Sequence, residues 1–150
     1  MVIDSAARFV YVVNEFGNSI SAYRIDSSGA LVPIPGSPFL AGHDPIQVAV
    51  DPTARFLYVA NRGSNDVSAY SISSDGTLTP VPGSPFAGPD GPASVVVDPT
   101  ARFAYVLNRI GNSVSAYSIG SNGALTPVPG LSFATGIEPI SVVVTRPVLK

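Results

Sequence analysis

The side chains that could carry acid–base chemistry lie in two short segments, which differ among three otherwise similar stretches of the chain. Carboxylates and an imidazole can activate a water molecule, and guanidinium groups can hold a carboxylate or a phosphate. Loops that vary on a constant scaffold commonly carry function. The candidates for a ligand-binding face are therefore the ionisable residues of these segments: Glu15, His43, Asp44, Arg62, Asp90, Arg109 and Glu138.

His43 is the only histidine, and the chain has no cysteine. This composition excludes a thiol nucleophile and any metal site built from several histidines or cysteines of one chain, so we expect no metal and no cofactor. His43 and Asp44 could form an acid–base pair. Their Gly/Pro-flanked loop is also compatible with plain solvation. Under an enzymatic interpretation, His43 and Glu138 are the catalytic candidates; otherwise none is expected.

The elements that must position these residues repeat with a fixed spacing. The run Asp51–Val59 recurs as Asp98–Val106, and a less similar copy begins at Asp4. Arg8, Arg55 and Arg102 are each 47 residues apart. Such a period indicates a repeat architecture. We divide the single segment 1–150 into repeats of approximately 4–50, 51–97 and 98–144, followed by a tail at 145–150.

Each repeat predicts four short antiparallel strands. In the second repeat they span 55–61, 66–72, 78–83 and 93–97, with a loop at 84–92. The Asp75-Gly76 pair supplies a hairpin turn. Pro80 and Pro82 place the third strand at an edge, and Val95–Val97 indicates a buried inner strand. No window has helical spacing. This all-β layout is typical of a β-propeller blade, with three blades per chain.

The variable segments of such a blade emerge on one face, which is the usual ligand entrance. The repeated residues away from that face have structural interpretations. The arginines at 8, 55 and 102 are expected to pair with Asp4, Asp51 and Asp98 or to cover the blade base. Three asparagines at strand ends are expected to bind local backbone, and three tyrosines within strands are expected to pack: Asn14, Asn61, Asn108, Tyr23, Tyr70 and Tyr117.

The overall composition limits the partners. Charged residues make up 12% of the chain and the net charge is −2, so no basic field exists for a nucleic acid or an anionic membrane. No apolar run approaches the length of a spanning helix. Met1 leads into Val2-Ile3-Asp4 without the features of a signal peptide, and the compartment stays open.

Three blades are too few to close a propeller, and an open arc would expose two apolar sheet faces. The predicted inner strand Ile140–Val144 has no blade of its own, whereas the first blade has only Val2-Ile3. We therefore expect head-to-tail association with itself, six blades in a dimer being favoured over nine in a trimer. A fragment of a longer propeller, or an engineered self-assembling one, is the alternative.

Three segments each combine a strand end with a following hairpin: Tyr11-Val12-Val13-Asn14, Tyr58-Val59-Ala60-Asn61 and Tyr105-Val106-Leu107-Asn108. With the Gly-x-Leu-x-Pro-x-Pro-Gly segments, they resemble the YVTN-type, lactonase-like bacterial propellers related to 6-phosphogluconolactonase. The resemblance implies seven blades and unrepeated Glu, His and Arg residues around a central channel.

Two functions remain open. Near-identity of the copies favours a non-enzymatic scaffold or binding module, because catalysis needs unlike groups gathered in one place. The alternative is a lactonase-type hydrolase acting on a sugar-derived lactone, with Glu138, His43 and Arg62 or Arg109 as its site. The channel wall is expected to come from Val48–Val50, Val95–Val97 and Val142–Val144.

Overall fold

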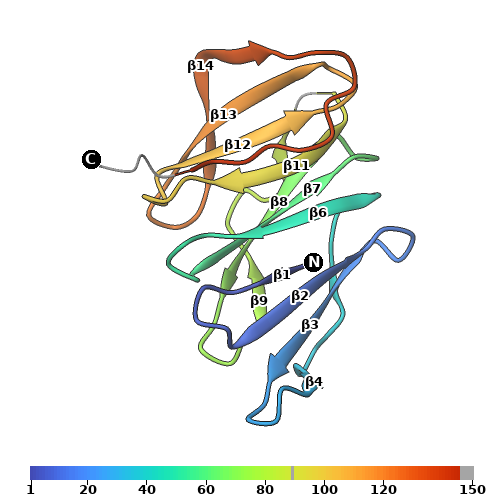
Figure 1. Cartoon of the computed structure of the whole chain (residues 1–150), viewed down its shortest axis with the longest axis vertical. Coiled ribbons are helices and arrows are strands. Elements are labelled where there is room, and N and C mark those ends of the chain that lie inside the picture. Colours follow the sequence, from blue (N-terminus) through green and yellow to red (C-terminus); the bar gives the residue numbers. More distant parts are fainter. Residues whose placement is uncertain (89, 146–150) are drawn as a thin grey trace.

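The computed structural model describes residues 1–88 and 90–145, which form three antiparallel sheets side by side (Figure 1). The first sheet holds β1 (Val2–Ile3), β2 (Phe9–Asn14), β3 (Ser19–Ile25), β4 (Leu31–Pro33) and β5 (Phe39–Leu40). The second holds β6 (Pro45–Val50), β7 (Phe56–Asn61), β8 (Asp66–Ile72), β9 (Leu78–Pro80) and β10 (Phe86–Ala87). The third holds β11 (Pro92–Val97), β12 (Phe103–Asn108), β13 (Ser113–Ile119) and β14 (Leu125–Ala134).

The all-β, antiparallel architecture expected from the sequence is confirmed. Each sheet runs outward in chain order, from the inner strands β1, β6 and β11 to the proline-bearing strands β4, β9 and β14. Proline has no N–H to donate, so it is tolerated at the outer edge. The second and third sheets thus take their inner strands, β6 and β11, from the end of the preceding sequence repeat.

Apolar side chains fill the two spaces between neighbouring sheets. Phe9, Tyr11 and Ile34 of the first sheet pack against Leu57 and Leu78 of the second. Equivalent residues of the second and third sheets form the other cluster: Phe56, Tyr58, Val81, Val106 and Leu125. All six residues of β7 are buried, because this strand has a sheet on either side.

The outer strands depart from the sequence prediction. The predicted loop 84–92 contains β10, which pairs with β8, and it already includes the first residue of β11. In the third sheet, β14 runs unbroken through the equivalent region. Ser84-Pro85 interrupts the ladder in the second sheet, where the Ala69 N–H donates to Ser84 Oγ (2.9 Å). The third repeat has Leu131-Ser132 instead, so nothing there blocks pairing.

The predicted inner strand Ile140–Val144 is wrong as a strand: these residues have no regular secondary structure. A strand is defined by ladder hydrogen bonds to a neighbouring strand. Among the described residues, no strand lies on the outer side of this segment to form such bonds. Val142–Val144 nevertheless borders the same hollow as Val95–Val97 of β11.

The turns at the base of the sheets are stabilised by aspartates. Asp51 is buried, and its Oδ1 accepts from the Arg55 and Phe56 N–H groups (both 2.7 Å). Among the described residues, only Arg8 forms the predicted ion pair, to Asp4 (3.2 Å). The guanidinium groups of all three arginines lie over the neighbouring phenylalanine rings, at 5.0–5.4 Å from the ring centroids. In the described part of the chain, we find no helix that is long and apolar enough to cross a membrane.

Candidate active site on the loop face

Backbone hydrogen bonds hold the two variable segments together. The Arg62 N–H donates to Asp44 O (2.9 Å), and the Gly63 N–H donates to His43 O (3.0 Å). The His43 N–H donates to Ser64 Oγ (3.1 Å). The β7–β8 turn therefore holds the loop that leads into β6, and both lie on one face of the molecule.

Three asparagines to which the sequence analysis gave no role also hold these loops: Asn18, Asn65 and Asn112. Asn18 Oδ1 accepts from the Asp44 N–H (3.0 Å), and Asn112 Oδ1 accepts from the Glu138 N–H (2.7 Å). Asn65 Oδ1 likewise accepts from the Gly91 N–H (2.9 Å). Each asparagine has a positive φ, which this residue type tolerates better than most. Their 47-residue spacing directly after the variable turn was the available signal.

Four of the predicted residues form one ion-pair cluster, the Arg62 cluster: Glu15, His43, Asp44 and Arg62. Arg62 Nη2 lies 3.1 Å from Glu15 Oε1 and 4.0 Å from Asp44 Oδ2. His43 Nδ1 lies 3.6 Å from Asp44 Oδ1, with 66% of the His43 side chain exposed. The cluster joins the first and second sheets, and its imidazole is open to solvent.

Gly63 makes room for the imidazole of His43. A Cβ at position 63 would overlap His43 Nδ1. The equivalent positions in the other two repeats carry Phe16 and Ile110. The Arg62 cluster is therefore a local departure from the repeat, and the position of the His43 ring depends on the glycine at position 63.

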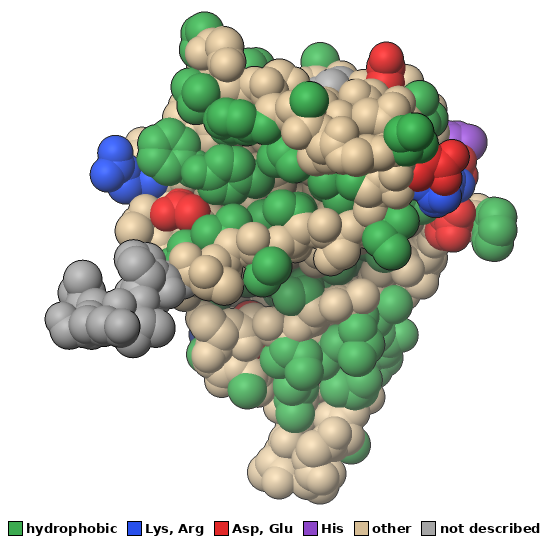
Figure 2. All heavy atoms as spheres, turned by 45° about the horizontal axis from the view of Figure 1, so that its top comes forward, with side chains coloured by type: hydrophobic (Ala, Val, Ile, Leu, Met, Phe, Trp, Pro, Cys, Tyr) green, Lys and Arg blue, Asp and Glu red, His purple; other side chains and the backbone are tan. Residues whose placement is uncertain are grey.

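A second ion pair joins Arg109 Nη2 to Glu138 Oε2 (3.1 Å). It borders an open hollow of about 450 Å³, and Arg62 of the first cluster lies on the same hollow. The remaining lining residues are Ile110, Asn112 and Ile137. Two arginines from neighbouring sheets therefore border one space, which suits an anionic ligand. Figure 2 shows the histidine and several charged side chains gathered at one edge of the molecule.

Asp90 is the one predicted residue that neither ion-pair group includes. Its side chain is exposed, and its carbonyl accepts from the Gly111 N–H (3.0 Å). No group of three or more His, Asp or Glu side chains within 1–88 and 90–145 could hold a metal ion. Any acid–base chemistry proposed here rests on His43 and the carboxylates.

The repeated asparagines and tyrosines have contacts that the sequence did not reveal. Asn61 Nδ2 donates to Asp66 Oδ1 (2.6 Å) and Ser68 Oγ (2.8 Å), so it binds side chains of the next strand and not local backbone. Asn14 and Asn108 bind serine hydroxyls in the same way. Tyr70 and Tyr117 are buried as expected, and burial raises the pKa of both phenols.

The inner strands border a hollow of about 310 Å³ that includes the predicted valines. Gln47 also lines it, so this wall is not wholly apolar. The amide of Gln47 is occupied, since Oε1 accepts from the Val95 N–H (2.8 Å) and Nε2 donates to Val48 O (2.8 Å). It bridges the inner strands of the second and third sheets.

Radially ordered antiparallel sheets, with inner strands around one hollow and variable loops on one face, define a β-propeller type of protein. The chain belongs to the family described as "Lactonase, 7-bladed beta-propeller", whose sequence model matches residues 1–84. A comparison with curated protein sequences gave no match.

Solved structures show the same fold. A candidate 6-phosphogluconolactonase from Bacteroides fragilis superposes with a TM-score of 0.84 at 22% identity, covering 93% of this chain and 39% of the other. The periplasmic gluconolactonase of Pseudomonas aeruginosa gives a TM-score of 0.82 at 16% identity, with 93% and 40% covered. A functionally unknown protein from Desulfotomaculum acetoxidans gives 0.78 at 22% identity, with 90% and 41% covered. This chain thus spans about two-fifths of the length of these relatives.

Proposed function

We propose that the chain supplies the substrate face of a lactone-hydrolysing propeller. The observation that carries this proposal is the Arg62 cluster, which places an exposed imidazole, two carboxylates and a guanidinium on the loop face of a lactonase-family fold. Family membership supports lactone hydrolysis more than the non-enzymatic scaffold that near-identity of the repeats favoured.

His43 is the proposed general base. Asp44 Oδ1 lies 3.6 Å from His43 Nδ1, and closing this distance to a hydrogen bond would let the carboxylate orient the ring. Nε2 then takes a proton from a water molecule, whose oxygen attacks the lactone carbonyl carbon. When the bond between that carbon and the ring oxygen breaks, the imidazolium returns the proton to the leaving oxygen. The products are a carboxylic acid and a hydroxyl group, which balances the reaction.

Arg62 and Arg109 are the proposed anion-binding groups. Both line the hollow of about 450 Å³, and each is already paired with a carboxylate, Glu15 or Glu138. These pairs are exposed and therefore weak, so a substrate phosphate or carboxylate can compete for the guanidinium groups. Anionic sugar lactones should then bind more tightly than neutral ones of equal size.

A non-enzymatic scaffold is the second candidate. It is favoured by the pairing of both guanidinium groups with carboxylates, since the named loop-face residues then include two further carboxylates, Asp44 and Asp90, and no further arginine. In this case the loop face is a tolerant surface.

The test is hydrolysis of a lactone panel by the purified chain, with and without divalent metal ions. The panel contains glucono-δ-lactone, 6-phosphogluconolactone and γ-butyrolactone. We expect turnover above the buffer rate, a loss of at least about 100-fold in kcat/KM in His43→Ala, and a raised KM for the phosphorylated lactone in Arg109→Ala. Ser27→Ala on the opposite face is the control. Absence of turnover, or turnover that His43→Ala leaves intact, favours the scaffold.

A further inference from the structure

A pair of aromatic side chains locks each sheet to the next in the same way. Tyr11 Oη donates to Gly76 O (2.9 Å), and Tyr58 Oη donates to Gly123 O (3.1 Å), each across a junction between sheets. The ring of Phe9 covers Gly76 so closely that a Cβ there would lie 2.7 Å from it. Phe56 covers Gly123 likewise. The lock thus consists of a Phe-x-Tyr strand on one sheet and a turn glycine on the following one.

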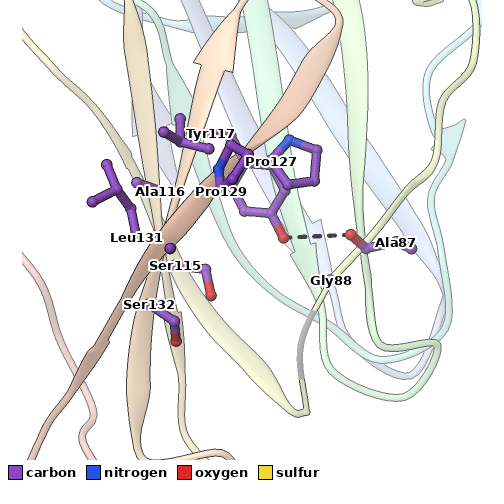
Figure 3. A pocket seen from close by; sticks show the side chains of 11 residues that line it. Ala87, Gly88, Ser115, Ala116, Tyr117, Pro127, Pro129, Leu131 and Ser132 are labelled. Atoms are coloured by element: carbon purple, nitrogen blue, oxygen red, sulfur yellow. Dashed lines mark hydrogen bonds between the residues drawn. The ribbon is translucent and has the colours of Figure 1, made fainter.

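A second tyrosine bonds across the same junctions in the opposite direction. Tyr70 Oη of the second sheet donates to Leu40 O of the first (2.5 Å). Tyr117 Oη of the third sheet donates to Ala87 O of the second (3.4 Å), as Figure 3 shows. Each junction therefore has two reciprocal tyrosine bonds, and all four tyrosines belong to positions repeated every 47 residues.

The two outer faces of the described chain present the matching halves of this lock. The third sheet carries Phe103 and Tyr105, both only half-buried, whereas Phe9, Tyr11, Phe56 and Tyr58 are buried. The first sheet carries Gly29. A Cβ added at this position would have no neighbouring side chain or backbone atom within 4 Å. The second tyrosine bond has unmatched partners too. Tyr23 of the first sheet is equivalent to Tyr70 and Tyr117, and the carbonyl of Ala134 at the end of β14 is equivalent to those of Leu40 and Ala87.

One repeated leucine position is buried in the second and third sheets but exposed on the open face of the first sheet. Leu78 of the second sheet is 5% exposed and Leu125 of the third is 4% exposed, because each packs against the preceding sheet. Leu31, which holds the same place in the first sheet, is 49% exposed. The first sheet thus displays the receiving half of a junction whose other half is on the third sheet.

We infer that the third sheet packs against the first sheet of a second copy of this chain. Tyr105 of one copy then donates to Gly29 O of the other, and Tyr23 of the other copy donates back to Ala134 O. Because the contact is head-to-tail, a closed ring makes it twice in a dimer. Two chains supply six sheets, within the four to eight blades that propellers typically have, whereas three chains would supply nine.

Charge on the loop face favours the same partner. The equivalent positions of the variable turn carry Glu15, Arg62 and Arg109 in the order of the sheets. Within one chain, Arg62 reaches Glu15 of the preceding sheet at 3.1 Å. In the ring, Glu15 of the second copy follows Arg109, so the contact brings opposite charges together. An added copy in the reverse orientation would lose this match.

The inner edge of β2 offers a third complementary feature. Val2 and Ile3 of β1 pair with Tyr11 and Val10, so within the described residues Val12–Asn14 have no inner partner. The fully paired equivalent, β6 on β7, extends from Val50 to Pro45. Residues 139–142 of the second copy correspond to the part of β6 that β1 lacks, and they belong to the segment that forms no strand in one chain.

Multi-angle light scattering on the intact chain between about 1 and 100 μM tests the inference. We expect twice the chain mass of 15.4 kDa at the upper concentrations and a melting temperature that rises with concentration. The double variant Y23F/Y105F removes four hydrogen bonds per dimer, each contributing about fivefold, so the dissociation constant should rise roughly 100- to 1000-fold.

Two matched variants serve as controls. Y58F/Y117F removes the same two bonds at the junction between the second and third sheets of one chain, so it should lower the melting temperature without weakening association. Leu31→Asp should prevent association, whereas Leu40→Asp should leave it intact, because Leu40 is exposed and lies at the junction between the first and second sheets of one chain. Circular dichroism checks that each variant is folded.

The outcomes separate clearly. A monomer at every concentration overturns the inference, and so does a trimer. Dissociation that is equally strong in Y58F/Y117F and Y23F/Y105F overturns the assigned contacts. The inference does not depend on lactone hydrolysis, because mass and turnover are measured separately: an inactive dimer or an active monomer refutes only one of the two proposals.

Discussion

Eight described residues other than glycine have a positive φ, and they fall into three repeated positions. Alanines occupy the first (Ala7, Ala54 and Ala101), asparagines the second, and Asp44 and Glu138 the third. The left-handed region costs an L-residue about 1–2 kcal/mol unless it is glycine or, to a lesser degree, asparagine. The second repeat has Gly91 at the third position, also with a positive φ (67°), so Asp44 and Glu138 accept a backbone strain that glycine avoids.

Replacing Ala101 by glycine should therefore stabilise the protein. Ala101 has a φ of 56°, and we expect the free energy of unfolding to rise by about 0.5–1 kcal/mol, the relieved strain being partly offset by unfolded-chain entropy. Ala104→Gly, in the buried part of β12, should instead destabilise by about 1 kcal/mol. Urea unfolding monitored by circular dichroism measures both, and equal signs would contradict the strain argument.

Acid should weaken one turn in a defined pH range. The hydroxyl of Ser73 and the Thr77 N–H donate to Asp75 and lower the pKa of its carboxyl from 3.8 to about 2. A depressed folded-state pKa stabilises the fold above the unfolded value, so this contribution is present above pH 4 and is lost as the pH falls toward 2. Melting temperatures should fall less steeply between pH 4 and pH 2 in Asp75→Asn than in the unsubstituted chain. Parallel curves would exclude this role.

Strands and loops differ in how much stability their side chains carry. The strand β7 is buried on both faces, and β12 is buried where Ala104 and Val106 pack against the second sheet, whereas the loop-face ion pairs are exposed. Stability should reside in the strands, which leaves the loops free to vary.

Substitutions in strands should therefore lower the free energy of unfolding more than substitutions in loops. Val106→Ala, at a fully buried position of β12, should cost about 2 kcal/mol through lost packing. Glu15→Ala breaks the pair with Arg62 and should cost about 0.5 kcal/mol or less, because both partners are exposed. Chemical denaturation distinguishes these values. A loss in Glu15→Ala as large as that in Val106→Ala would mean that the pair holds the sheets together.

At the scale of the whole molecule, the second sheet is the best supported because a sheet packs on each of its faces. In a dilute monomer, amides of β7 should exchange with deuterium at least about tenfold more slowly than those of β3 and β13. Ring closure would cover the outer sheets, so raising the protein concentration should narrow this difference. Mass spectrometry of peptic fragments at two concentrations measures it, and a difference that does not depend on concentration argues against association.

Much of this architecture was predictable from the sequence. Side chains alternate along Asp66–Ile72, and that strand has the predicted bounds. Pro80 places the strand Leu78–Pro80 at the edge of the sheet, and the valine run places β11 at the inner side. These features are local, because alternation, turn residues and missing N–H groups act within a few positions. Because the sequence repeats every 47 residues, the layout predicted for one sheet also applies to the next.

The tertiary structure decided what depends on a neighbouring sheet. The same residue type is buried at Leu78 and exposed at Leu31, and Tyr58 makes a bond that Tyr105 does not make within the described residues. His43 and Arg62 lie 19 positions apart, and only the packing of one loop on the next turn brings them into one cluster. The segment 140–144 is strand-like in sequence yet forms no strand, since a ladder requires a second chain segment alongside it.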